Sequence, residues 1–213
     1  EIPLRLVGSE MCIRDSNTIV LVMLYGIVCG NYALSGEVSA IYIVPSIIII
    51  TLGMKFIASR LGQRKALLFG ALGCIIFSSC LFLLFLFGNP KSMSFTNINL
   101  FTIAFITLWI LEQGFAGIAG NIVIPMTADC ADYETYRSGK YVPGLMGTLF
   151  SCVDKIISSF ATTIVGLLIA TIGFRTTQPT PDTPYSPQIF WITMACVFLL
   201  PIFGWLCNII AMR

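Results

Sequence analysis

The chain has 213 residues with 12 basic and 10 acidic side chains, and its mean hydropathy is +0.92. Only 10% of its residues are charged, against about 25% in an ordinary soluble domain, which is too few to cover a water-exposed surface of this size. The composition therefore predicts an all-α membrane protein. A chain without histidine cannot build a Ser-His-Asp triad or a histidine zinc site, so we expect no enzyme. A net charge of +2 is too small for nucleic-acid binding.

The eight cysteines include no CxxC pair. Six of them lie inside apolar stretches, where a thiol behaves as a small hydrophobic group: Cys29, Cys74, Cys80, Cys152, Cys196 and Cys207. We therefore expect no disulfide framework, no metal site and no cofactor in this chain.

The first sixteen residues differ in their residue pattern from the rest of the sequence. We interpret residues 1–16 as a non-native or adaptor-derived segment and residues 17–213 as the folded unit. A natural cytoplasmic loop that leads into the first helix is the alternative.

Six apolar stretches follow, and each is long enough to cross a hydrocarbon core of about 30 Å as a helix. Turn-forming or polar segments separate them, including a predicted polar loop from Ala128 to Gly144. The sequence thus predicts six transmembrane helices, near residues 17–34, 38–58, 66–88, 99–126, 146–172 and 189–212.

The basic residues predict the orientation of these helices. Seven of them fall on one side of the predicted membrane, and two, Lys91 and Arg175, fall on the other. Because cytoplasmic segments are enriched in lysine and arginine, we expect both termini in the cytoplasm of a multi-pass protein of the plasma membrane. The seven are Lys55, Arg60, Arg64, Lys65, Arg137, Lys140 and Arg213.

The fifth predicted helix carries a polar stripe. On a helical wheel, five hydroxyl residues fall within about 60° of Lys155, and Asp154 lies about 100° away. The hydroxyls could join neighbouring helices, with Lys155 paired to an acid, or they could line a wet solute cavity. A lysine within a span favours the cavity, because burying its charge is costly. The hydroxyl residues are Thr148, Ser151, Ser158, Ser159 and Thr162.

Polar residues also occur in the fourth and first predicted helices. Glu112 and Gln113 could line the cavity or form a buried hydrogen-bonded pair, and Asn121 and Tyr25 could reach a solute. Small residues at helical spacing predict close packing instead. They are Gly114 and Gly117 in the fourth helix and the GxxxG pair of Gly26 and Gly30 in the first.

The densest charged segment runs from Asp129 to Lys140. Asp129 and Asp132 project from one face if the helix continues, because they are three residues apart. The segment could be a solvated loop, or these carboxylates could form a cytoplasmic gate with the nearby cations Arg137 and Lys140.

The segment DCADYETYRSGK resembles the DxxDYGEWKTGKR motif of the glycoside-pentoside-hexuronide:cation symporters, a branch of the major facilitator superfamily that includes melibiose carriers. It matches in type and spacing at Asp129, Asp132, Tyr133, Tyr136, Arg137, Gly139 and Lys140. Lys155, the ATIGF segment and the basic segment MKFIASRLGQRK also resemble family features. Glu134-Thr135 and Tyr141 depart from the motif.

This resemblance implies the C-terminal half of a twelve-helix fold that carries sugars or glycosides with sodium or protons by alternating access. It places Tyr133 in the gate region, and it implies a partner, the N-terminal six-helix half, which would hold the coupling-cation site. A six-helix channel or structural membrane protein is the alternative, because it would show the same hydropathy.

Overall fold

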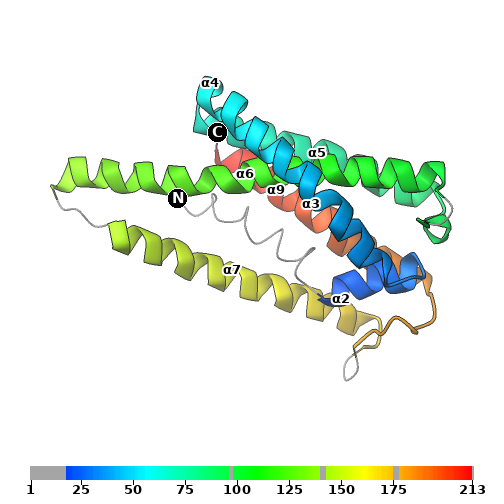
Figure 1. Cartoon of the computed structure of the whole chain (residues 1–213). Coiled ribbons are helices and arrows are strands. Elements are labelled where there is room, and N and C mark those ends of the chain that lie inside the picture. The colour runs from blue at the N-terminus through cyan, green and yellow to red at the C-terminus, as the bar shows by residue number, and fades with distance from the viewer. Residues whose placement is uncertain (1–17, 96–97, 140–142, 175–177, 213) are drawn as a thin grey trace.

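The structure is a computed structural model that describes residues 18–95, 98–139, 143–174 and 178–212. Within these ranges the regular secondary structure is entirely helical (Figure 1). Five helices are long and apolar enough to cross a membrane, and a shorter apolar helix, Thr18–Val28, precedes them. The predicted all-α membrane class is confirmed. The five long helices are Leu34–Ile57, Gln63–Phe87, Leu100–Ser138, Gly147–Thr171 and Pro187–Ala211.

Several of these helices contain short π-helical segments, which are η2, η3 and η5, whereas η4 is a short 3-10 helix. In chain order the elements are α2 (Thr18–Leu21), η2 (Val22–Val28), α3 (Leu34–Gly53), η3 (Met54–Ala58), α4 (Ser59–Leu61), α5 (Gln63–Phe87), η4 (Pro90–Ser92), α6 (Leu100–Ser138), α7 (Pro143–Thr171), α8 (Pro187–Met194), η5 (Ala195–Leu199) and α9 (Leu200–Ala211). The predicted adaptor-derived segment, residues 1–16, and the predicted gate residue Lys140 lie outside the described residues.

The first helix ends earlier than the sequence predicts. Its described part, Thr18–Val28, covers about 16 Å at 1.5 Å per residue and ends six residues before the predicted end at 34. The chain turns at Gly30, whose φ of 79° suits a residue without a side chain, and α3 begins four residues earlier than expected. Apart from its chain neighbours, no described residue has an atom within 4 Å of a Cβ built on Gly30, so the described part of the chain does not pack against Gly30 as predicted.

The fourth helix is longer than predicted. The expected loop from Ala128 to Gly144 is wrong over most of its length, because α6 continues to Ser138. Polar residues alone do not end a helix, and the sequence contains no glycine between Gly120 and Gly139. Gly139 ends α6 in the left-handed conformation, with φ of 70°, and its amide donates to the Thr135 carbonyl. The helix passes through Pro125 without ending.

α6 packs closely against α3 and α5, and glycines make this approach possible. A Cβ on Gly114 would lie 2.6 Å from Ile49 Cγ2, and one on Gly117 would overlap Ile50. A Cβ on Gly70 of α5 would lie 3.1 Å from the Ala119 amide nitrogen. The packing predicted for Gly114 and Gly117 is therefore confirmed.

The second connection and the end of the last helix lie at the same end of the bundle. Arg64, at the start of α5, donates a hydrogen bond from Nε to the carbonyl of Met212, at 2.8 Å. This arrangement agrees with the even number of crossings predicted from the sequence. Figure 1 shows the C-terminus beside α4 at this end, while α7 runs beside the group formed by α3, α5, α6 and α9.

Candidate transport surface

The predicted polar stripe of α7 is largely uncovered. Lys155, Ser151 and Thr162 are exposed, and Ser158 and Asp154 are half-buried. The described residues of α7 that are buried, Ala161, Val165 and Ile169, lie in its C-terminal half and join the core. On a helical wheel, Asp154 falls in the same angular sector as these three buried residues, and Lys155 lies about 100° away from Asp154. The polar stripe therefore lies beside the packed face of α7, and Asp154 lies on the same side of the helix as that packed face.

Four of the five hydroxyl groups of the stripe donate hydrogen bonds within their own helix. Thr148 donates to the carbonyls of Gly144 and Leu145, and Ser151 donates to the carbonyl of Gly147. Ser159 donates to the Lys155 carbonyl at 2.8 Å, and Thr162 donates to the Ser159 carbonyl at 2.9 Å. These bonds leave the oxygen lone pairs free to accept, so the stripe can hydrogen-bond water or a polar solute.

A second group of predicted site residues lies in the protein interior. Glu112 is 1% exposed and Gln113 is 4% exposed, both in the central part of α6, and Tyr25 of η2 is also buried. The thiol of Cys74 lies 3.9 Å from the Glu112 carbonyl oxygen. Asn121 is exposed on α6 and donates to the Gly117 carbonyl at 2.8 Å. The structure thus separates Glu112, Gln113 and Tyr25 from the exposed stripe on α7.

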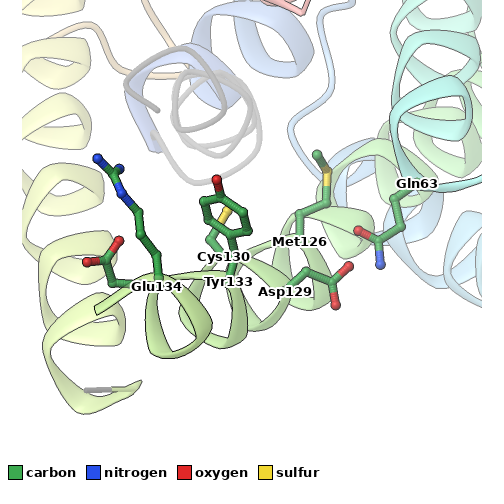
Figure 2. Close-up of a pocket in the computed structure, with 7 residues that line it drawn as sticks. Gln63, Met126, Asp129, Cys130, Tyr133 and Glu134 are labelled. Carbon is green, nitrogen blue, oxygen red and sulfur yellow. The ribbon is translucent and has the colours of Figure 1, made fainter. Parts of the chain in front are cut away.

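The third group surrounds a hollow of about 330 Å³ at the end of the bundle that holds Arg64 and Met212. Its walls come from the last four turns of α6 and the start of α5. Figure 2 shows Asp129 of α6 and Gln63 of α5 turned toward each other, with Tyr133 and Cys130 further along α6. The lining residues are Gln63, Met126, Asp129, Cys130, Tyr133, Glu134 and Arg137.

The two predicted gate aspartates differ in position. Asp129 lines the hollow, whereas Asp132 is exposed outside its lining. Among the described residues, neither carboxylate forms an ion pair with Arg137. The hollow combines acidic, basic, aromatic and amide groups, so it offers hydrogen-bond donors and acceptors to a partner surface.

Sequence reasoning missed Gln63, Met126, Cys130 and Glu134 as parts of this hollow. Met126, Cys130 and Tyr133 recur at helical spacing on α6, so the signal was present in the sequence. It was not used because this stretch was interpreted as a loop. Gln63 is contributed by another helix, and only the three-dimensional arrangement places it there.

The fold and these surfaces define a multi-pass helical membrane protein with a polar face in one spanning helix. Residues 20–213 match the family described as MFS/sugar transport protein. Because the match covers most of the chain, the chain belongs to this family and is a transporter. Comparison with curated proteins and comparison with solved structures each give no match.

Proposed function

We propose that this chain is the C-terminal half of a secondary active transporter that carries a sugar or glycoside together with sodium or a proton. Its six helices would move against an N-terminal six-helix half, and substrate would bind between the two. The observation that supports this proposal is the uncovered polar stripe of α7, where Lys155 lies among hydroxyl groups. A charged side chain in a spanning helix needs a partner or water, and a shared cavity supplies both.

Each group of site residues takes a role in this proposal. Lys155 donates hydrogen bonds to substrate hydroxyls or neutralises acidic cation ligands of the other half when they are empty. Asp154, Ser151, Ser158 and Thr162 line the same wall, and Asn121 is exposed on α6. Glu112, Gln113 and Tyr25 are buried, so in this proposal they support the helices behind the wall and do not contact the substrate. The gate is formed by Asp129, Asp132, Tyr133, Arg137 and Lys140. The coupling cation binds in the N-terminal half, and no other cofactor takes part.

A reconstitution experiment tests the half-transporter proposal. Proteoliposomes that contain this chain alone should show no sugar-stimulated cation flux, because only one wall of the site is present. Adding an N-terminal six-helix half of the same family as a separate chain should produce saturable uptake. Saturable uptake by the chain alone would instead favour the six-helix channel or a self-sufficient carrier.

A labelling experiment tests whether the α7 stripe is wet. Single cysteines at Ser151 and Thr162 should react with a water-soluble maleimide, because thiolate forms in water and the stripe would face a cavity. A cysteine at Ile47 of α3, which is 54% exposed on an apolar face, is the matched control and should react slowly in lipid. Equal slow reaction at all three positions would place the α7 stripe against lipid and contradict the proposal.

The proposed plasma-membrane orientation has its own test. Lys55, Arg60, Arg64, Lys65 and Arg137 lie on the connections at the Arg64–Met212 end, and Lys91 lies at the other end, so we place the first end in the cytoplasm. In intact cells, an impermeant reagent should label a cysteine at Thr183 and spare one at Gln63. The opposite pattern would reverse the orientation.

A further inference from the structure

The connection between α7 and α8 folds back over the first helix at the bundle end away from Arg64 and Met212. We call its described residues, 178–187, the strap. A Cβ on Gly26 of η2 would lie 3.1 Å from Pro181 Cα and 3.3 Å from Pro181 Cβ, so the strap approaches the helix closely enough that an added side chain would push Pro181 away by a few tenths of an ångström. Pro179 is buried at the same connection. Figure 1 shows this orange segment passing beside the blue α2 region.

A second contact fixes the strap to a neighbouring connection. The Lys91 ammonium nitrogen of η4 lies 4.8 Å from the centre of the Tyr185 ring, within the range of a cation–π interaction. The first contact lies inside a turn, because the Thr180 amide donates to the Thr183 hydroxyl at 3.0 Å. The strap is therefore held at two points, at Pro181 within the turn and at Tyr185 after it.

The strap lies against a helical turn whose inward residues are shielded from water. Tyr25 is 2% exposed and Cys29 is 4% exposed, and both belong to the core that the first helix shares with α7 and η5. Gly26, the residue against which Pro181 rests, lies between them in the same segment. Pro181 therefore rests on the helical turn that contains Tyr25 and leads to Cys29.

We propose that the strap is a hinged cover over the first helix, closed in this structure by the Lys91–Tyr185 contact and the seat of Pro181 on Gly26. Tyr185 is 47% exposed, so its cation–π contact with Lys91 is solvated and weak. Such a contact shifts the equilibrium between the open and closed positions of the strap by about two- to fivefold. A cover held this weakly can open without disturbing the helices beneath it. The proposal is independent of the substrate, the coupling ion and the orientation in the membrane.

Native cysteines allow a direct test. Cys29 lies three residues after Gly26, on which Pro181 rests, and Cys196 of η5 is similarly shielded, at 1% exposure, in the same core. The full chain is purified in detergent and treated with N-ethylmaleimide, and mass spectrometry measures the labelling rate of each cysteine. Lys91→Gln should raise the rate at Cys29 about two- to fivefold and leave Cys196 unchanged.

Matched variants separate loss of the contact from general loosening. Lys91→Arg keeps the cation and Tyr185→Phe keeps the ring, so both should label at the wild-type rate. Tyr185→Leu should act like Lys91→Gln, and the double variant should label no faster than either one. Gly26→Ala should also accelerate Cys29, because the added methyl displaces Pro181.

Three results would overturn the proposal. Unchanged Cys29 labelling in Lys91→Gln and Gly26→Ala would show that the strap covers nothing. Parallel acceleration at Cys29 and Cys196 would show that the whole core had loosened. If the increase in the Cys29 labelling rate of the double variant equalled the product of the two single-variant increases, Lys91 and Tyr185 would act separately. None of these results depends on transport, so they leave the half-transporter proposal unaffected.

Discussion

α3 and α7 are both poorly covered by the rest of the chain, yet their uncovered faces differ in chemistry. In the most apolar 18-residue window, 11% of α3 and 17% of α7 is buried, against 50% of α6. The uncovered side chains of α3 include Ile41, Ile43, Val44, Ile47 and Ile48. Those of α7 include Lys155 and several hydroxyl residues. Exposure alone therefore does not identify a functional surface in a membrane protein, and the polarity of the exposed face separates lipid contact from water contact.

A charge placed on each face should give the largest contrast. Val44→Lys puts an ammonium near the middle of the apolar face of α3, and we expect it to cost about 2.5–3.5 kcal/mol of membrane insertion. Thr162→Lys puts the same group on the polar stripe of α7, where water would hydrate it. An insertion assay with a glycosylation reporter measures both. Equal costs at the two positions would remove the distinction between the faces.

Removal of the native charge tests the α7 face for function. Lys155→Leu keeps much of the side-chain bulk at an exposed position, so the melting temperature should stay close to that of the wild type. Coupled uptake by the assembled transporter should fall at least about tenfold, because the ammonium donors and charge are lost. Lys155→Arg should restore part of the activity, since guanidinium keeps the charge and changes its shape. Uptake at the wild-type rate by Lys155→Leu would show that Lys155 has no role in transport and only extends its ammonium group toward water.

The two aspartates of α6 offer a smaller comparison within one segment. Asp132→Asn should slow transport severalfold while sugar binding stays measurable, because the proposed gate loses a charge that pairs with a cation in one state. Asp129→Asn also changes a wall of the hollow beside Gln63 and should weaken the closed state. Single-turnover uptake and equilibrium sugar binding separate rate from affinity. Unchanged rates in both variants would support a solvated segment without a gate.

Glycine substitutions compare the stability of a covered helix with that of an uncovered helix and do not touch the transport residues. Gly73→Ala in α5 would overlap the Phe115 ring and should lower stability by about 1–3 kcal/mol. For Gly166→Ala in α7, no atom of another described segment lies within 4 Å of the new methyl, so better helix propensity should raise stability by up to about 1 kcal/mol. Thermal unfolding in detergent measures both. A loss of stability in Gly166→Ala would reveal a surface packed against that position.

Much of the fold could be predicted from the sequence because membrane helices are governed by local hydrophobicity and length. The five long helices, and the close packing at Gly114 and Gly117, follow from such local signals. The end of α6 could not be placed correctly, since charged residues in a helix outside the membrane resemble those of a loop. The break at Gly30 was also missed, because the same glycine spacing suits both helix packing and a turn.

For the candidate site, the sequence predicts which types of residue occur on each helix better than it predicts how those residues are arranged in space. The wheel for α7 correctly placed Lys155 and its hydroxyl neighbours on one stripe, because helical periodicity alone determines that relation. It could not indicate which side of α7 the core covers, since that depends on Ala161 and Val165 meeting residues from distant segments. The hollow beside Gln63 and the seat of Pro181 on Gly26 likewise depend on contacts between elements far apart in the chain.

The continuous α6 helix has a mechanical consequence. Its 39 residues form a rod of about 58 Å, nearly twice the thickness of the hydrocarbon core, so its charged end projects well beyond the lipid. Ser138 lies about 39 Å along the rod from the level of Glu112. Tilting the rod by about 10° at that level would sweep its tip through about 7 Å, enough to bring the charged end against a neighbouring surface or away from it. A small rotation of α6 at its packed glycines would therefore move its charged end by several ångströms.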